Sequence, residues 1–240
     1  CLIRNPHWQP ERLTHGRADI CFLRDASETE RKLRRTPMTK EEVREVSICK
    51  LHLTENAVVY DIGSGTGSVA IEIAGVPGRV QVYAIERKPE AVELLRKNRA
   101  QFHMDNIQII EAPAPEGLEE LPVPTHAFIG GSGGRLMDIL RVLYRKNPHM
   151  RIVINAISME TIAELKEVLD TFPVEEEEIL QMQVSRVKKL LSYHLPQAEN
   201  PVWICSFTFR ETGKDPMDNS KKTKPGAEET GNGKNGEVQR

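Results

Sequence analysis

Short apolar runs alternate with amphipathic segments along most of the chain. The runs are rich in valine and isoleucine, as in Val58-Val59-Tyr60, and such runs are typical of strands buried in a parallel sheet. The segments between them place apolar residues at helical spacing. We expect strands at 57–61, 80–85, 107–111, 125–130, 150–155, 177–187 and 202–209, and helices at 39–52, 67–74, 89–102, 134–146 and 158–170.

This alternation predicts an α/β fold with a doubly wound, mostly parallel sheet of seven strands and helices on both faces. The last two strands are long enough to pair as an antiparallel hairpin, through the segment that contains Tyr193, His194 and Pro196. Thr39 and Glu42 have the spacing of a capping box, which predicts the start of the first helix. Ligands are expected at the carboxyl ends of the strands.

The two ends of the chain differ in composition from the part between them. Residues 1–35 are rich in charge and show no clean period, which predicts a linker or the end of a preceding domain. Residues 36–210 carry the alternating pattern of the domain. Residues 211–240 contain almost no apolar side chains and cannot bury enough surface to offset their ordering entropy. We therefore expect a disordered tail there.

Charge and cysteine usage exclude several classes of protein. The net charge is -2, whereas nucleic-acid binding usually needs a basic face. No apolar run approaches the ~20 residues of a membrane span. No metal site is predicted, because Cys-x-x-Cys pairs are absent and the carboxylates of the acidic run 175–178 alternate between the faces of a strand. We expect a cytoplasmic protein whose cysteines are reduced thiols, namely Cys1, Cys21, Cys49 and Cys205.

The loop after the first predicted strand reads Asp61-x-Gly63-x-Gly65-x-Gly67. Glycine permits a ligand to approach the backbone closely, and the N–H groups of the following helix favour a polar ligand. Ser68 stands where the dinucleotide fingerprint requires glycine. The loop instead resembles motif I of the Rossmann-like methyltransferases that use S-adenosylmethionine (SAM), in which the acid helps to hold the amino-acid end of SAM. A tight turn without a ligand is the alternative.

A second acidic residue supports the cofactor interpretation. Glu86 ends the second predicted strand, 19 residues after Gly67. A carboxylate at that strand end can accept hydrogen bonds from two ribose hydroxyls. The loop and Glu86 together predict a nucleoside-type cofactor.

A second glycine-rich loop, residues 130–134, follows the fourth predicted strand. Successive small residues can turn several N–H groups toward one anion, and the dipole of the next helix adds a partial positive charge. We interpret this loop as a nest for a substrate carboxylate, with a flexible strand–helix joint as the alternative. Asn155, Arg186 and His194 also fall at strand ends or crossings, where each is either a substrate-facing group or an ordinary surface residue.

Several stretches together resemble one family. Over roughly residues 36–209 the chain is similar to the decarboxylating precorrin-6B carbon-15 methyltransferases of cobalamin biosynthesis. The resemblance implies the class I fold of SAM-dependent methyltransferases. It also implies methylation of a precorrin at carbon 15 and decarboxylation of its acetate at carbon 12. The stretches that carry it are Pro37-Met38-Thr39-Lys40 with Glu42-Val43-Arg44, the Asp61–Ser68 loop, Ala84-Ile85-Glu86, Phe128–Gly134 and Asn200-Pro201-Val202.

The resemblance also implies which residues form the site. This chain departs from the family's pattern at Pro113, where the family commonly has an acidic residue. His194 becomes a candidate for handling a proton, Asn155 for facing the substrate, and Arg135 or Arg186 for holding peripheral carboxylates. Substrate contacts would come from Gly130, Gly131, Ser132, Gly133, Gly134 and Arg135. SAM contacts would come from Thr39, Asp61, Gly63, Ser64, Gly65, Thr66, Gly67, Glu86 and Ala114.

Other inferences concern assembly and rival functions. Residues 1–25 are similar to the region after the carbon-5 methyltransferase domain of fused precorrin-6Y enzymes, so the chain is expected to be the C-terminal part of such a fusion. Free-standing members of the family suggest a homotetramer.

Two alternative functions stay open, a SAM methyltransferase of another substrate such as tRNA or protein, and a non-catalytic SAM-binding module. The cobalt content of the substrate and the order of methylation and decarboxylation also stay open.

Overall fold

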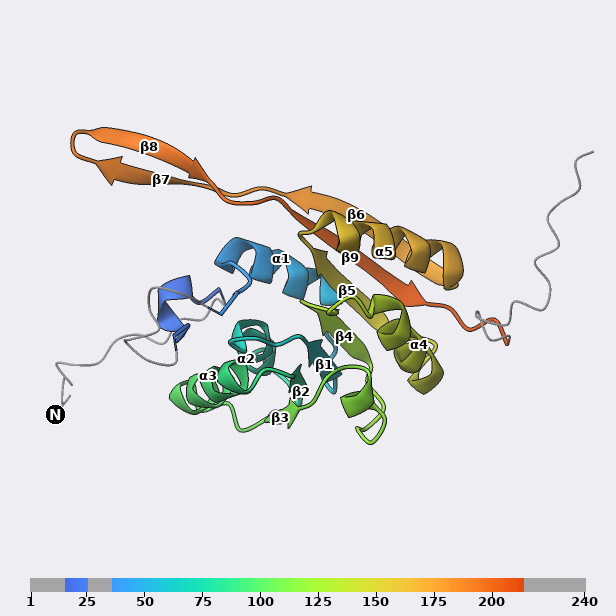
Figure 1. The fold of residues 1–240 in the computed structure, drawn as a ribbon. Helices are drawn as coiled ribbons and strands as arrows, with labels where there is room; N and C mark the ends of the chain where they lie inside the picture. Colours follow the sequence, from blue (N-terminus) through green and yellow to red (C-terminus); the bar gives the residue numbers. More distant parts are fainter. Residues whose placement is uncertain (1–15, 26–35, 214–240) are drawn as a thin grey trace, which may run out of the picture.

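One mixed sheet dominates the part of the chain that the computed structural model describes, residues 16–25 and 36–213. Its strands follow the order β3-β2-β1-β4-β5-β9-β6 (Figure 1). The first five strands along the chain are parallel, and β9 runs antiparallel to both of its neighbours. The strands are β1 (Val58–Ile62), β2 (Gln81–Glu86), β3 (Ile107–Glu111), β4 (His126–Ile129), β5 (Arg151–Ala156), β6 (Val174–Met182) and β9 (Val202–Phe209).

Helices cover both faces of this sheet because alternate strand residues point to opposite sides. In β1, Val59 packs into one apolar cluster and Tyr60 into the other. The Val59 side carries α1 (Glu41–Leu51), α2 (Ser68–Ala74) and α3 (Pro89–Gln101). The Tyr60 side carries α4 (Leu136–Lys146) and α5 (Met159–Thr171). The predicted doubly wound α/β sheet is confirmed.

The order of the strands reverses beside β1, and this reversal positions the site. β1 pairs with β2 on one side and with β4 on the other. The chain leaves the carboxyl ends of β1 and β4 toward opposite faces of the sheet, which opens a crevice between the two loops.

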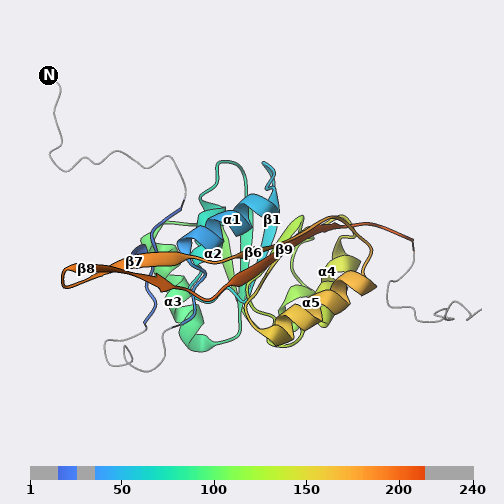
Figure 2. The ribbon, with the colours of Figure 1, turned by 90° about the horizontal axis from the view of Figure 1, so that it is seen from above.

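Beyond β6 the prediction of one strand over 177–187 is wrong. The chain leaves the large sheet after Met182 and forms β7 (Ser185–Leu190) and β8 (Tyr193–Ala198), a separate antiparallel pair. We call residues 185–198 the arm, which projects away from the domain (Figures 1 and 2). Pro201 lacks an N–H and cannot continue the ladder of β9. The predicted antiparallel pairing of the last two sheet strands is confirmed for β6 and β9.

The predicted capping box at the start of α1 is also wrong. The helix begins at Glu41, and no side chain caps it at the N-cap residue, Lys40. Instead, the backbone N–H of Glu41 donates to Oδ1 of Asp19 at 3.0 Å. The carbonyl of Thr39 accepts from Nη1 of Arg44 at 2.7 Å. A distant aspartate therefore replaces the local cap that the sequence spacing predicted.

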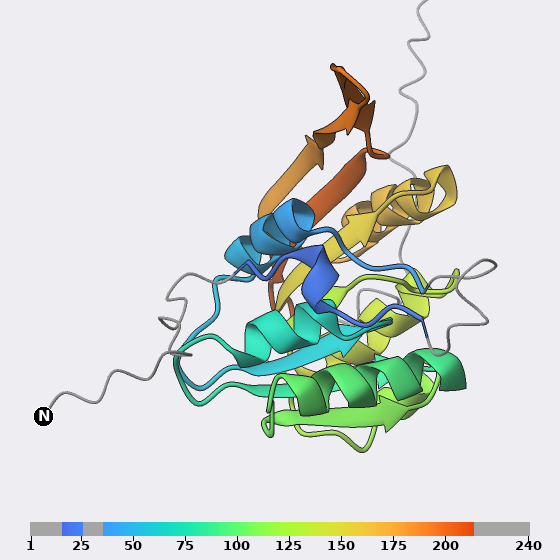
Figure 3. The ribbon, with the colours of Figure 1, turned by 90° about the vertical axis from the view of Figure 1, so that its left-hand side faces the viewer.

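Residues 16–25 pack on the domain, although the sequence pattern placed them in a linker (Figure 3). The guanidinium of Arg44 is fully buried, donates to the carbonyl of Arg17 and lies 4.9 Å from the centre of the Phe22 ring. Arg17 donates from its backbone N–H and its side chain to Glu72 of α2. The predicted linker at 1–15 and 26–35 and the predicted tail at 214–240 lie outside the described residues.

Two further findings bear on the sequence predictions. None of the helices in residues 16–25 and 36–213 is long and apolar enough to cross a membrane. Within the same residues the cysteines Cys21, Cys49 and Cys205 are free thiols, and His, Cys, Asp and Glu side chains form no group that could hold a metal ion.

The buried charges of Arg44 and Glu72 lead to a prediction about stability. Both side chains have no exposed surface, and their nearest charged atoms are 3.8 Å apart. Glu72→Ala should lower the free energy of unfolding by about 3–5 kcal/mol, because it removes the fully buried one of the two carboxylates beside the Arg44 guanidinium, the other being Asp19 at 3.4 Å, and also removes the partner of Arg17. Chemical denaturation measures this. The control Asp170→Ala breaks the exposed pair of Lys166 and Asp170 on α5 and should hardly move the midpoint. Equal effects of the two variants would contradict the prediction.

Candidate cofactor and substrate site

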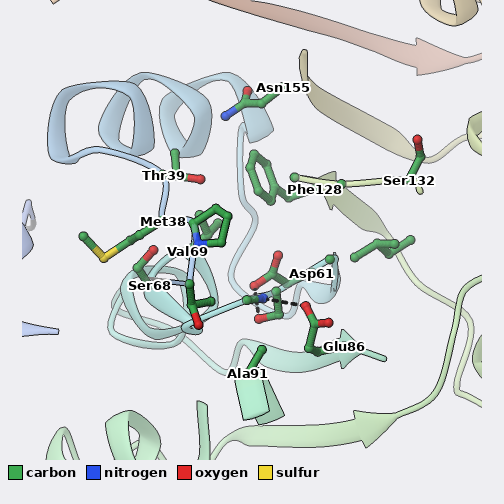
Figure 4. Close-up of a pocket in the computed structure, with 18 of the residues that line it drawn as sticks. Met38, Thr39, Asp61, Ser68, Val69, Glu86, Ala91, Phe128, Ser132 and Asn155 are labelled. Atoms are coloured by element: carbon green, nitrogen blue, oxygen red, sulfur yellow. Dashed lines mark hydrogen bonds between the residues drawn. The ribbon is translucent and has the colours of Figure 1, made fainter. Parts of the chain in front are cut away.

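A single cavity of about 610 Å³ opens at the carboxyl ends of β1, β2 and β4. Its walls are the loops after these strands, the segment 36–40 before α1, and the residues at the base of the arm. Figure 4 shows Asp61, Glu86, Phe128 and Asn155 around the same space. The volume falls in the range that holds a cofactor-sized ligand. The crevice expected at the strand reversal is therefore a real cavity.

The glycines of the first loop are required by the protein's own packing. A Cβ on Gly63 would lie 2.6 Å from the carbonyl oxygen of Gly131, and one on Gly67 would lie 2.1 Å from Cδ1 of Leu95 in α3. Both glycines also have positive φ angles, +74° and +80°, which other residues rarely adopt. The expectation that these side chains are absent because a ligand approaches therefore needs correction at both positions.

Asp61 presents an unsatisfied oxygen to the cavity. The residue ends up fully buried because it stands near the carboxyl end of the central strand. Its Oδ2 accepts from Oγ of Ser64 at 2.6 Å and from the backbone N–H of Ala70 at 3.1 Å. Its Oδ1 has no partner within the described part of the chain. Burial raises the pKa of Asp61 to about 7, so a bound cation would find here a carboxylate that needs a counter-charge.

Glu86 ends β2 and is held by backbone donors. Its Oε2 accepts from the N–H of Gly65 at 3.0 Å, which is the dashed line in Figure 4. Its Oε1 accepts from the N–H groups of Arg87 and Lys88, each at 2.9 Å. A carboxylate offers about four lone-pair sites, so this fixed side chain can still accept a bond from a sugar hydroxyl. Asp61 and Glu86 thus fit the two ends of a molecule that carries an ammonium group and a ribose, as SAM does.

The second glycine loop is an adjacent wall of the same cavity. The backbone of Gly131 in this loop lies against Gly63 of the first loop. A Cβ added to Gly131 itself would have no atom of the described residues within 4 Å. Gly133 has a φ of +62°, and a Cβ there would lie 3.5 Å from Nη1 of Arg87. The loop leads into α4, whose first residue is Leu136. A ligand on one loop would therefore be within reach of the other.

The cavity gathers most, but not all, of the residues that the sequence predicted. Thr66 and Gly67 of the first loop and Gly134 of the second are not among the residues that line it. The residues that line it are Thr39, Asp61, Gly63, Ser64, Gly65, Glu86, Ala114, Gly130, Gly131, Ser132, Gly133, Arg135 and Asn155.

The candidates for catalysis are placed differently from one another. Asn155 lines the cavity, but its amide exchanges hydrogen bonds with Oγ of Ser47 at 3.0–3.1 Å. Arg186 lies on β7 and pairs with Glu42 of α1 at 2.5 Å. His194 is exposed on β8. Neither Arg186 nor His194 is among the residues that line the cavity.

Sequence reasoning missed several residues of the site. Arg87 and Lys88 line the cavity directly after Glu86, and their position just past a strand end is a signal that was available. The ring of Phe128 also faces the cavity (Figure 4). Its place within an apolar strand run gave no such signal, because core and cavity-facing residues look alike there.

Comparisons with known proteins agree with this geometry. The family described as the precorrin methyltransferase domain matches residues 34–208. The probable cobalt-precorrin-6B C(15)-methyltransferase (decarboxylating) of Sulfolobus acidocaldarius is 37% identical over 171 residues, which cover 70% of this chain and 88% of that protein. The protein of the same name from Methanothermobacter thermautotrophicus is 37% identical over 179 residues, covering 74% and 92%.

Solved structures are similar as well. Precorrin-6y C5,15-methyltransferase from Geobacter metallireducens superposes with a TM-score of 0.71 and 34% identity, covering 81% of this chain and 98% of that one. A SAM-dependent O-methyltransferase from Thermotoga maritima superposes with a TM-score of 0.62 at 16% identity, covering 76% and 70%, and this likeness shows the class I methyltransferase fold alone. Fold, cavity and sequence likeness therefore agree with the predicted resemblance, and the chain belongs to the precorrin methyltransferase family.

Proposed function

We propose that this chain uses SAM to methylate carbon 15 of cobalt-precorrin-6B, or of its cobalt-free counterpart, and removes the carboxylate of the acetate at carbon 12. The named activity of the 37%-identical relatives supports this reaction. The observation that carries the proposal is the unpartnered oxygen of Asp61 beside the fixed carboxylate of Glu86. These two groups match the ammonium and the ribose of SAM.

The residues of the first loop hold the cofactor. Asp61 would bind the ammonium group, and Glu86 a hydroxyl of the ribose, while Thr39 and Ala114 would flank the ligand from the remaining walls. When bound, SAM supplies an electrophilic methyl group. Ser64 keeps Oδ2 of Asp61 occupied, so the free Oδ1 is the atom available to the ligand.

The second loop and its neighbours position the substrate. A reduced tetrapyrrole is electron-rich at its bridging carbons, so the chain need not supply a strong base, and positioning and electrostatics account for most of the catalysis. Gly131, Ser132 and Gly133 would hold a carboxylate with backbone N–H groups, whereas the N–H of Gly130 donates to the carbonyl of Ile62 at 2.9 Å. Arg135 lies at the same wall. The Asn155 amide, fixed by Ser47, would face the macrocycle.

We also propose that the chain assembles with copies of itself through the arm, in the tetramer that the family resemblance implies. Two-stranded pairs are marginally stable by themselves, and this one exposes Val187, Leu190, Leu191, Tyr193 and Leu195. His194 would then act on a proton only if the arm of one copy reached the cavity of another. Sedimentation equilibrium measures the assembly state directly.

Two further predictions rest on the family and on composition. The chain is proposed to function in the cytoplasm, where reduced cysteines are expected. It is also proposed to work together with a carbon-5 methyltransferase domain, as the name of the Geobacter relative implies for that protein.

The ribose assignment is tested by Glu86→Ala. Loss of a charge-assisted hydrogen bond costs about 1.5–3 kcal/mol, so the Kd for SAM should rise roughly ten- to a hundredfold. Isothermal titration calorimetry measures the Kd. The control is Glu111→Ala, which removes the carboxylate at the end of the neighbouring strand, directly in register with Glu86 but paired with Arg96 outside the cavity. An unchanged Kd for Glu86→Ala would exclude the assignment.

The Asp61 assignment predicts how SAM binding depends on pH. Without ligand the carboxyl is protonated below about pH 7, whereas a bound cation favours the carboxylate. SAM should therefore displace a proton below pH 7, and the Kd should rise about tenfold for each pH unit below that value. In the absence of SAM, the contribution of Asp61 to the free energy of unfolding changes with pH in the opposite direction. This contribution is fully present below the unfolded pKa of 3.8 and is lost as the pH rises through 7.

Calorimetry in two buffers of different ionisation enthalpy counts the displaced proton. Asp61→Asn is the matched variant, because it keeps the size of the side chain and cannot titrate. It should bind SAM more weakly and without the pH dependence between 5 and 7. A pH dependence that persists in Asp61→Asn would show that another group titrates on binding.

The proposed reaction is tested with a series of side chains at Gly131. Alanine has room there because nothing described lies within 4 Å of its Cβ position, whereas valine and leucine would occupy the space of the substrate carboxylate. Incubation with cobalt-precorrin-6B and SAM, followed by mass spectrometry, should show methylation and decarboxylation retained in Gly131→Ala and lost together in Gly131→Leu. The SAM Kd should stay within about twofold. Full activity of Gly131→Leu would show that the loop is only a joint.

A further inference from the structure

Four cationic side chains line the cavity, and they differ in whether an acid neutralises them. Lys40 lies 3.4 Å from Asp19, and Arg135 lies 2.5 Å from Glu116. The other two are Arg87 and Lys88, whose side chains have no acidic partner in residues 16–25 and 36–213. The cavity therefore carries two uncompensated positive charges at its edge.

Arg87 is held so that its side chain crosses the mouth of the cavity. Its backbone N–H donates to Oε1 of Glu86 at 2.9 Å, which fixes the residue at the end of β2. Its guanidinium reaches the loop after β4, where Nη1 lies 3.5 Å from the Cβ position of Gly133. Because β1 lies between β2 and β4, this side chain extends over the strand that carries Asp61.

The acids of the cavity do not neutralise this edge. Asp61 is buried with Oδ2 already bonded, and the Glu86 carboxylate is occupied by three N–H groups. The third acid of the lining, Glu199 at the base of the arm, forms no ion pair with Arg87 or Lys88 among the described residues. The lining of the cavity also includes apolar side chains, among them Phe128, Ile157 and Val184. A polycarboxylate that enters would therefore meet both unpaired cations and apolar surface.

The proposed reaction restricts which carboxylate can pair with a cation. A carboxylate that leaves as CO2 loses its charge in the transition state, so an ion pair would stabilise the ground state more and slow the reaction. Carboxylates that remain on the macrocycle carry no such cost. A bidentate guanidinium suits them best, since it matches carboxylate geometry and fixes orientation.

We propose that Arg87, with Lys88 beside it, binds a retained carboxylate of the substrate and so orients the macrocycle above the cofactor. This assignment rests on the proposed function and adds a specificity residue that the family motifs did not single out. Arg135 and Arg186, which the sequence suggested for this role, already have acidic partners.

The test uses uroporphyrin III, a stable tetrapyrrole that carries carboxylates and cannot be turned over. Quenching of its fluorescence by the intact protein reports the Kd. Arg87→Gln should raise this Kd roughly ten- to a hundredfold, the range for a lost charge-assisted bond, and Arg87→Lys should restore part of the affinity. Arg145→Gln is the matched control, because it removes an equal charge from an exposed pair on α4.

Two further readouts separate positioning of substrate from other roles. The SAM Kd and the melting temperature of Arg87→Gln should equal those of the unaltered chain. With cobalt-precorrin-6B, KM should rise while kcat and the ratio of decarboxylation to methylation change little. The octamethyl ester of uroporphyrin III, which lacks the charges, should bind both proteins equally weakly.

The outcomes distinguish this inference from the proposed function. An unchanged uroporphyrin Kd in Arg87→Gln, an equal loss in Arg145→Gln, or a loss of SAM affinity would overturn the assignment of Arg87. If the unaltered chain binds uroporphyrin through Arg87 but converts no precorrin, the carboxylate site stands and the proposed reaction fails. Absence of uroporphyrin binding by the unaltered chain would also overturn the inference.

Discussion

The backbone contact between the loops after β1 and β4 is the constraint on which the cavity depends. Gly63 lies so close to the carbonyl of Gly131 that no side chain fits between them. The contact brings the acidic residues of the first loop and the bare backbone of the second into one space. A methyl donor and its acceptor must meet at bonding distance, so this proximity is a requirement of the proposed chemistry.

The same space is divided by charge. Carboxylates of Asp61 and Glu86 lie at the floor, where burial and backbone donors fix them. Cations lie at the mouth, and Arg87 crosses from β2 to the loop after β4. This arrangement suits a cationic cofactor held deep in the cavity and an anionic substrate held above it. The net charge of the chain is close to zero, so the separation comes from placement and not from overall composition.

A segment far from the cavity in sequence also supports its wall. Asp19 caps the first turn of α1, and Arg44 holds the carbonyl of Thr39 from within a buried cluster of charges. The residues just before α1 line the cavity, so residues 16–25 contribute to the site without touching it. Asn98 of α3 adds a second link, because it bonds both Leu23 and the carbonyl of Thr66 in the first glycine loop.

The sequence by itself determined the alternation of strands and helices, the two glycine loops and the acids Asp61 and Glu86, because these depend on local period and spacing. It did not determine the arm, the cap of α1 or the reason for Gly67, since each depends on residues far apart in the chain: Val202 paired with Met182, Asp19 beside Glu41, and Leu95 beside Gly67. Only the tertiary structure decided which polar residues share the cavity. Arg186 and His194 looked equivalent to Asn155 along the chain, yet the chain leaves the large sheet after Met182 and carries both away from the cavity, while Arg87 reaches across it.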